Sequence, residues 1–227
     1  MLRVCYTGVF DTRRDILNQP RPLARLVAGF AGSSPSSTIA RYGSRATIRG
    51  RLTSALGSGL ARAQVDVFER IDVAGASEAK VGSTVTRPDG SFSWRLKGTG
   101  PSRSVRLATR ASDRDGDVVS KTVRLRVRAA STLRVVLRGR TVRFSGRLLS
   151  RPLPKKGKRL ELRGRAPGFD WASFATVRAG RNGRFSGTYR LPVRRPGVRL
   201  QIRISVPVER GYPYLSYRGR PVTVRVR

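Results

Sequence analysis

Residues 198–206 read VRLQIRISV, and apolar and polar side chains alternate along this stretch without exception. The same alternation runs through VRLRVR at 123–128. A period of two is typical of a β-strand that has one face in a core and the other in water. From Thr38 onward, no comparable segment repeats its apolar residues at helical spacing. The sequence therefore predicts an all-β fold.

The chain carries one pattern of strands and turns twice. IRGRL at 48–52, the turn RPDG at 87–90 and VRLRVR at 123–128 return as FSGRL at 144–148, RNG at 181–183 and VTVRVR at 222–227. The copies are offset by 96, 93 and 99 residues. These offsets are the size of a domain, whereas solenoid repeats span about 20–50 residues. We therefore expect two small domains in tandem.

Each copy is predicted to contain about seven strands, which is typical of an antiparallel sandwich. Asp89-Gly90, Asp115-Gly116 and Asn182-Gly183 are predicted to form hairpin turns, because glycine tolerates a positive φ. The predicted strands lie at 38–41, 46–52, 63–70, 81–86, 91–96, 104–110 and 119–128, and at 132–138, 141–148, 158–165, 172–178, 184–191, 198–206 and 220–227.

Residues 1–37 share no pattern with the repeats and are expected to form a poorly ordered leader and linker, with a short helix possible over 23–30. The domains are expected at 38–128 and 129–227. No clear signal peptide precedes them. We expect that the start is mis-assigned or that the chain is a fragment of a longer secreted protein.

The composition excludes several classes of function. Histidine is absent and Cys5 is the single cysteine, so the sequence excludes an intrachain disulfide, a Cys/His metal site and a histidine-based catalytic triad. No apolar run is long enough to span a membrane. We expect no enzymatic activity, no cofactor and a monomeric chain.

The net charge is +35, from 48 Lys and Arg against 13 Asp and Glu. Such a charge attracts polyanions at low salt. Most arginines occupy the outward positions of predicted strands, however, and no recognition helix or RNA-binding motif is present. Genome composition is a second source of an arginine excess. We expect anions or cell-wall glycans as possible partners and no specific nucleic-acid motif.

The chain resembles the bacterial immunoglobulin-like and carboxypeptidase-regulatory-like (prealbumin-like) β-sandwich repeats of secreted actinobacterial proteins. The resemblance covers most of the chain from residue 38 onward. It implies two tandem antiparallel, immunoglobulin-like Greek-key sandwiches that serve as spacers or adhesive stalks, outside the cell or in its envelope. It carries over no catalytic residue. The matching segments are 42–52, 59–67, 89–92, 144–148, 174–177, 183–185 and 211–214.

Three groups of residues are candidates for binding. Three carboxylates in five residues suggest a calcium loop, although the EF-hand order is not met. The densest basic run suggests a polyanion site, and aromatic residues beside turns suggest stacking on a sugar ring. The alternative for each group is a solvated loop or a plug at the end of a sandwich. The residues are Asp113, Asp115 and Asp117 for calcium; Arg151, Lys155, Lys156, Lys158 and Arg159 for a polyanion; and Trp171, Tyr212 and Tyr214 for a sugar.

The sequence thus predicts a non-catalytic structural or adhesive tandem module of a secreted or cell-envelope protein. Two alternatives stay open. One is a polyanion-binding module, for nucleic acid or an anionic envelope polymer. The other is a carbohydrate-binding accessory domain.

Overall fold

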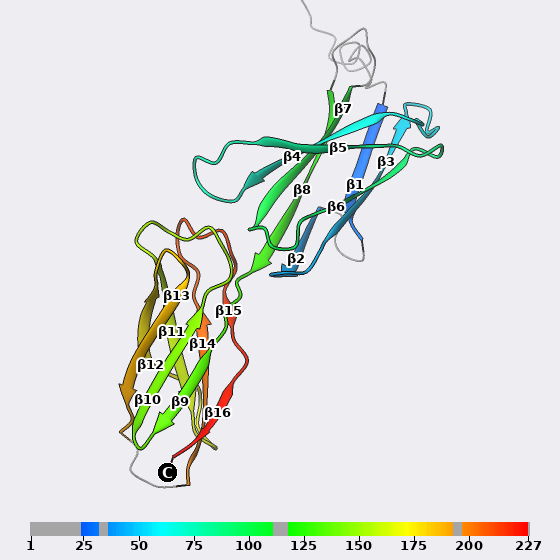
Figure 1. The fold of residues 1–227 in the computed structure, drawn as a ribbon. Coiled ribbons are helices and arrows are strands. Elements are labelled where there is room, and N and C mark those ends of the chain that lie inside the picture. Colours follow the sequence, from blue (N-terminus) through cyan, green and yellow to red (C-terminus); the bar gives the residue numbers. More distant parts are fainter. Residues whose placement is uncertain (1–23, 32–35, 111–117, 193–196, 227) are drawn as a thin grey trace, which may run out of the picture.

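The structure is a computed structural model that describes residues 24–31, 36–110, 118–192 and 197–226. All the regular elements in these ranges are β-strands, and they form two sandwiches that lie end to end (Figure 1). The predicted all-β tandem fold is confirmed. In the described part of the chain, no helix has the length and apolar character needed to cross a membrane.

The first sandwich packs a three-stranded sheet, in the order β1-β3-β6, on a five-stranded sheet, in the order β2-β8-β7-β4-β5. The strand bounds agree with the sequence prediction to within about two residues from β2 onward, as expected for strong alternation. The strands are β1 (Ala24–Phe30), β2 (Ser37–Arg41), β3 (Thr47–Ser54), β4 (Gln64–Ile71), β5 (Ala79–Val85), β6 (Ser91–Arg95), β7 (Arg103–Arg110) and β8 (Val118–Arg128).

The second sandwich repeats this arrangement. Its sheets have the orders β9-β10-β13 and β12-β11-β14-β15, and β16 also pairs with β14. In both sandwiches the chain changes sheet after the second strand of the smaller sheet, which produces the Greek-key, immunoglobulin-like connection. The strands are β9 (Arg134–Arg138), β10 (Thr141–Arg147), β11 (Lys158–Arg165), β12 (Ala172–Ala179), β13 (Arg184–Arg190), β14 (Arg199–Val206), β15 (Tyr217–Arg218) and β16 (Val222–Arg225).

One pairing departs from the expected antiparallel sheets. β2 lies parallel to β8, with Ser37 opposite Arg124 at one end and Arg41 opposite Arg128 at the other. The remaining strand pairs of both sandwiches are antiparallel. β2 therefore extends the larger sheet of the first sandwich along the side of its last strand.

The expected leader is wrong for residues 24–30. These residues form β1, which pairs with β3 over seven positions from Ala24–Ser54 to Phe30–Ile48. Ala24, Leu26, Ala28 and Phe30 face inward and are buried, so a short helix is also wrong here. The pairing and the buried face make β1 an integral strand of the first sandwich, although its small alanines weaken its alternating pattern in the sequence.

The core of each sandwich consists of the inward residues of its two sheets. In the first sandwich Ile48 and Phe92 from one sheet meet Val65 and Leu107 from the other, and all are at most 3% exposed. Leu162 and its neighbours play this role in the second sandwich. Burying one such side chain stabilises the fold by about 1.5–3 kcal/mol.

A glycine under a phenylalanine ring occurs at the same place in both copies. A Cβ atom on Gly50 of β3 would lie 2.3 Å from Cζ of Phe92 on β6. A Cβ atom on Gly146 of β10 would lie 2.5 Å from Cζ of Phe185 on β13. The phenylalanine lies flat across its neighbouring strand, which explains why the sequence repeats a glycine within an apolar strand.

The two predicted turns are real, but they are not hairpins. The Gly90 amide donates to the Arg87 carbonyl at 2.9 Å, and the Gly183 amide donates to the Gly180 carbonyl at 2.8 Å. Each turn links a strand of the larger sheet to a strand of the smaller one, β5 to β6 and β12 to β13. The third predicted turn, at Asp115-Gly116, lies outside the described residues.

Candidate functional site

The junction between the sandwiches is closed by backbone hydrogen bonds. The loop between β14 and β15 reaches the first sandwich, where the Pro213 carbonyl accepts a bond of 2.9 Å from the Ser102 amide. The Leu215 amide donates to the Val127 carbonyl at 2.8 Å, and its carbonyl accepts from the Ala129 amide at 3.0 Å. Arg128 and Leu215 also form a parallel bridge. The chain is thus pinned on both sides of the residue where β8 ends.

Three tyrosines, which we call the tyrosine cluster, fill this junction. Tyr42 comes from the first sandwich, whereas Tyr212 and Tyr214 come from the second. The ring centroids of Tyr42 and Tyr214 are 6.1 Å apart in an edge-to-face arrangement, and those of Tyr212 and Tyr214 are 5.0 Å apart. Aromatic pairs of this kind contribute about 0.5–1.5 kcal/mol beyond the area that they bury. The cluster therefore joins the two cores.

The hydroxyl groups of the buried tyrosines are satisfied by one loop. The Tyr212 hydroxyl lies 2.5 Å from the Ser150 hydroxyl, and the Tyr214 hydroxyl donates to the Arg151 carbonyl. Burial raises the pKa of both phenols well above its ordinary value of 10.0. The two groups therefore stay neutral at physiological pH and act as hydrogen-bond partners within the junction.

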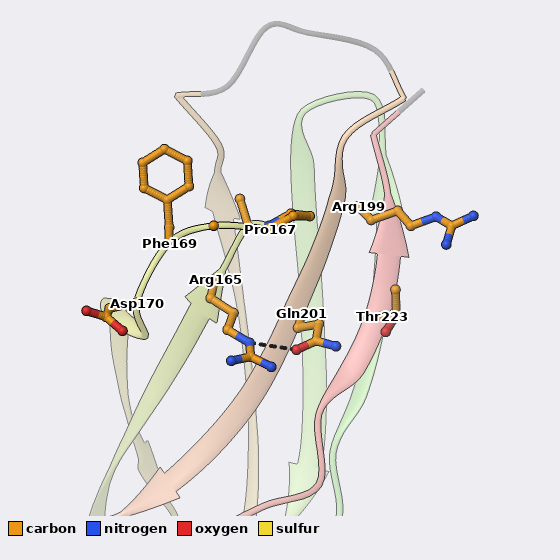
Figure 2. Close-up of a pocket in the computed structure, with 9 residues that line it drawn as sticks. Arg165, Pro167, Phe169, Asp170, Arg199, Gln201 and Thr223 are labelled. Atoms are coloured by element: carbon orange, nitrogen blue, oxygen red, sulfur yellow. Dashed lines mark hydrogen bonds between the residues drawn. The ribbon is translucent and has the colours of Figure 1, made fainter.

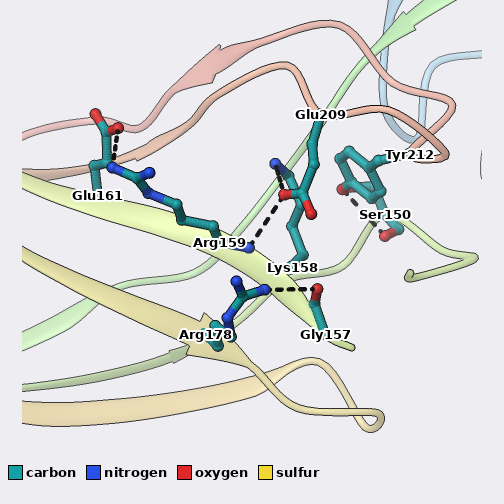
Figure 3. Close-up of polar contacts among 8 residues, drawn as sticks. All are labelled: Ser150, Gly157, Lys158, Arg159, Glu161, Arg178, Glu209 and Tyr212. Atoms are coloured by element: carbon teal, nitrogen blue, oxygen red, sulfur yellow. Dashed lines mark hydrogen bonds and ion pairs between the residues drawn. The ribbon is translucent and has the colours of Figure 1, made fainter. Parts of the chain in front are cut away.

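Beside the tyrosine cluster lies a buried ion pair, drawn in Figure 3. The Lys158 Nζ atom is 2.7 Å from Glu209 Oε2 and 5.2 Å from the centre of the Tyr212 ring. The Lys158 side chain is 0% exposed, and burial lowers its pKa despite the opposing effect of Glu209. Burial alone raises the pKa of Glu209, but the hydrogen bond and charge of Lys158 outweigh it, so the pKa is lowered. The pair fastens β11 to the junction loop.

A second buried cation lies in the first sandwich, close to the junction. Arg103 begins β7 and is 1% exposed. Its two Nη atoms donate to the Pro101 and Lys97 carbonyls at 2.8 and 2.9 Å. Its Nε atom lies 3.1 Å from Glu69 Oε2, an ion pair whose angles are not those of a hydrogen bond. These contacts fix the loop before β7, whose Ser102 binds the second sandwich.

The structure divides the predicted polyanion residues. Arg151, Lys155, Lys156 and Arg159 are exposed around one loop, in keeping with a surface patch. Lys158 is wrong as a member of this patch. Its ammonium points into the protein toward Glu209, because β11 begins at this residue and turns its side chain inward.

Two of the three predicted sugar-stacking residues are also wrong. Tyr212 and Tyr214 are 5% and 4% exposed, since the first sandwich covers the loop that carries them. Trp171 is partly exposed, and guanidinium groups occupy its ring: the Cζ atom of Arg203 lies 3.8 Å from the ring centre and that of Arg165 lies 5.0 Å from it.

The predicted calcium residues Asp113, Asp115 and Asp117 lie outside the described residues. Within the ranges that the structure describes, no group of three or more Asp, Glu, His or Cys side chains could hold a metal ion.

Sequence reasoning missed Arg103, Glu209, Ser150 and Tyr42 as junction residues. An isolated acid in a basic segment, such as Glu209, is a signal that could have pointed to a buried cation nearby. The other three carry no local signal, because their partners belong to loops far away in the chain. Sequence reasoning also missed the guanidinium groups that gather around Trp171.

Among known proteins, this chain is similar to solved structures. No protein-family model and no curated protein matches the sequence. A tetra-tandem repeat from the extending region of a large adhesion protein is 16% identical, with a TM-score of 0.40, over 89% of this chain and 49% of that chain. The Escherichia coli adhesin FdeC is 14% identical, with a TM-score of 0.38, over 88% and 63%. The adhesin InvE of Yersinia pseudotuberculosis is 11% identical, with a TM-score of 0.37, over 89% and 58%. The chain thus spans less than two thirds of each of these three chains.

Proposed function

We propose that this chain is a non-catalytic structural or adhesive module of a secreted or cell-envelope protein. In this proposal its two immunoglobulin-like sandwiches act as one stiff rod that sets the distance between whatever lies at its two ends. The location outside the cytoplasm rests on the resemblance to secreted β-sandwich repeats.

One observation carries the proposal: backbone hydrogen bonds and an aromatic contact join the two sandwiches at the junction, beside the buried side chains of Tyr212 and Tyr214. Tandem domains that move freely meet through small, solvated contacts. Here the Ser102 amide is bonded to the second sandwich, and Tyr42 packs on Tyr214. Ala129 in the connecting segment is 2% exposed, so the segment is part of the core rather than a free linker.

The chemistry of the junction also favours a structural role. The Tyr212 and Tyr214 phenols are neutral and hydrogen-bonded, and the Lys158 ammonium is paired with Glu209. Neither group presents an activated nucleophile or a free base to solvent. These side chains bond within the second sandwich and fix the loop whose backbone binds the first sandwich.

The stiffness can be tested by measuring distances between spin labels. Cysteines are introduced at the exposed positions Ser83 on β5 and Thr188 on β13, in a Cys5→Ser background. We expect a single narrow distance distribution for the otherwise unmutated chain. The Tyr42→Ala variant should broaden it, because this change removes the one tyrosine of the cluster that the first sandwich contributes.

A matched control is Tyr189→Ala, which removes an aromatic ring that packs against Phe174 at 4.9 Å within the second sandwich. This variant should keep the narrow distribution. A broad distribution in the unmutated chain would contradict the proposal directly. Equal broadening in Tyr42→Ala and Tyr189→Ala would show that the tyrosine cluster does not set the orientation.

A further inference from the structure

The positive charge of the chain is concentrated in its second sandwich. Residues 129–227 contain 25 Lys and Arg against 3 acids, a net charge of +22. Residues 38–128 contain 18 Lys and Arg against 8 acids, a net charge of +10. A uniform bias toward arginine codons does not account for the loss of acids from one copy of a duplicated fold.

Within the second sandwich, arginines converge on the outer face of the larger sheet. Leu162 of β11 is opposite Ile204 of β14, and both point into the core. The next pair is therefore outward, and it places Arg163 directly opposite Arg203. Like charges in directly opposed positions of a sheet are destabilising. This juxtaposition needs a compensating anion or some other source of stability.

Two guanidinium groups, those of Arg165 and Arg203, lie over the Trp171 ring, and two more arginines lie beside Arg203. Besides Arg163 and Arg203, the group includes Arg165 of β11 and Arg218 of β15, the neighbour of β14. Burial and then the charges of Arg218, Arg163 and Arg165 lower the pKa of Arg203. We call Arg163, Arg165, Arg203, Arg218 and Trp171 the arginine–tryptophan cluster.

Three of the four arginines of the cluster are held by contacts within the protein. Arg203 stacks with its Cζ atom 3.8 Å from the centre of the Trp171 ring. The Arg163 Nη2 atom donates to the Trp171 carbonyl at 2.6 Å, and the Arg165 Nε atom donates to Gln201 Oε1 at 2.7 Å. A fixed guanidinium loses little conformational entropy when it binds an oxyanion.

The four cations have no carboxylate partner in the described part of the chain. Of the three acids of the second sandwich, Glu161 pairs with Arg159 and Glu209 pairs with Lys158. The third, Asp170, is exposed and forms no ion pair within the described ranges. The Nε atoms of Arg163 and Arg203 are buried without a hydrogen-bond partner. The site therefore has donors and positive charge in excess.

An open hollow of about 630 Å³ adjoins the cluster and shares Arg165 with it (Figure 2). Arg165 and Gln201 lie on its floor, and Arg199 and Thr223 line it as well. Phe169 stands away from the sheet at its rim and is 75% exposed. An amide, a hydroxyl and an exposed aromatic ring are the groups that contact a sugar residue.

We propose that the arginine–tryptophan cluster binds a sulfate or phosphate ester group of an anionic polysaccharide, and that the hollow receives a neighbouring sugar of the same chain. Planar guanidinium groups match the oxygens of such esters in bidentate fashion. A single-stranded nucleic acid is disfavoured because it stacks successive bases on several aromatic faces, whereas Arg203 already covers Trp171 and the lining of the hollow offers the single ring of Phe169. The proposal goes beyond the structural role and does not depend on it.

The test uses the full chain in a Trp94→Phe background, so that Trp171 is the remaining tryptophan. A heparin octasaccharide is the sulfated probe, and calorimetry measures its affinity at an ionic strength of about 0.15 M, where distant charges are screened. We expect binding that changes the fluorescence of Trp171. The Arg163→Gln/Arg203→Gln variant should bind about tenfold more weakly or worse, because each lost contact is a charged hydrogen bond.

The matched control is Arg134→Gln/Arg143→Gln, which removes the same charge from β9 and β10 of the opposite sheet. It should change the affinity by less than about threefold, because the screened field of the whole protein is nearly unchanged. The Arg203→Lys variant keeps the charge and loses the planar fork, so it should also weaken binding. Melting curves verify that all variants fold.

Several outcomes would overturn the proposal. Equal losses of affinity in the two double variants would mean that heparin is attracted only by the overall positive charge of the protein. Unchanged affinity in Arg203→Lys would mean that the guanidinium plane is not used. Equally tight binding of an oligothymidylate, with the same Trp171 signal, would assign the site to nucleic acid. A polyphosphate arm of the experiment, tested against the same variants, distinguishes phosphate from sulfate as the preferred ester.

Discussion

Replacing Glu209 by Gln tests whether the buried ammonium of Lys158 depends on its partner. The substitution keeps the shape of the side chain and an oxygen that can accept from Nζ, but it removes the negative charge. Breaking a fully buried ion pair costs about 3–5 kcal/mol. Glu209 is 31% exposed, so water already shares its carboxylate. We therefore expect a loss of about 2 kcal/mol in the free energy of unfolding of the second sandwich.

Urea denaturation at neutral pH, followed by circular dichroism, measures this loss. Glu161→Gln is the matched control, since Glu161 pairs with the exposed Arg159 at 3.6 Å. It should change the free energy of unfolding by at most about 0.5 kcal/mol. Lys158→Met should cost less than Glu209→Gln, about 1 kcal/mol, because the charge that it leaves unpaired is the Glu209 carboxylate, which is 31% exposed and hydrated.

The dependence on pH gives a second check. Burial lowers the pKa of Lys158 below its ordinary 10.5, so the unfolded chain binds more protons than the folded one in the alkaline range below that value. Stability from this group therefore rises with pH. Without Glu209 the pKa falls further, so the deficit of the Glu209→Gln variant should shrink as the pH rises from 7 toward about 10. An unchanged stability in Glu209→Gln, or a deficit that grows with pH, would refute the reasoning.

Three further predictions follow from other contacts. Gly50→Ala should destabilise the first sandwich by about 1–3 kcal/mol in urea denaturation, because its Cβ atom would overlap the ring of the phenylalanine on β6. Gly180→Ala is the control and should cost little, because a Cβ atom there would lie 3.7 Å from the nearest atom outside its chain neighbours. In a spectrophotometric titration, the two buried phenols of the tyrosine cluster should stay neutral above pH 10.0, and stability should fall once the pH exceeds that value, because only the unfolded chain releases these protons. The hydrogen bond from Arg106 lowers the pKa of Glu78, so its contribution should be present above pH 4.5 and be lost as the pH falls below it. Melting curves should show that Arg106→Gln weakens this acid dependence, and an unchanged dependence would contradict the assignment.

Much of the fold could be predicted because each strand shows its alternating pattern in its own local sequence. VRLQIRISV and VRLRVR reveal their buried faces through alternation alone, and the strand bounds follow. β1 was not predicted, because alanines such as Ala24 and Ala28 indicate a buried strand face only weakly. Its pairing partners on β3, from Ile48 opposite Phe30 to Ser54 opposite Ala24, are distant in the sequence, and that pairing is what makes it a strand.

The turns show a different limit. The residues at Asp89-Gly90 and Asn182-Gly183 specify a tight reversal, and the structure has one at each place. A local turn does not determine whether the next strand pairs with the previous one or crosses to the opposite sheet. That choice is made by the packing of the core, so the hairpin interpretation was wrong even though the turn chemistry was right.

The sites were the least predictable part. Lys158, Tyr212 and Tyr214 look like surface residues of loops, yet β11 turns Lys158 inward and the contact between the sandwiches buries the two tyrosines. The arginine–tryptophan cluster depends on the register between β11 and β14, which brings residues about forty positions apart onto one face. Charge counts along the chain show an excess of arginine but do not show where guanidinium groups converge.

The parallel pairing of β2 with β8 has a mechanical consequence. Tension applied between Ser37 and Arg128 pulls these two strands past each other along their length. Their hydrogen bonds then bear the force together in shear, instead of opening one at a time as in an antiparallel hairpin pulled from its free ends. Past Arg128, the covalent chain carries the tension into the second sandwich, and the bridge to Leu215 supports it from the side. A tether made in this way yields abruptly at a high force, and it keeps its length until that force is reached.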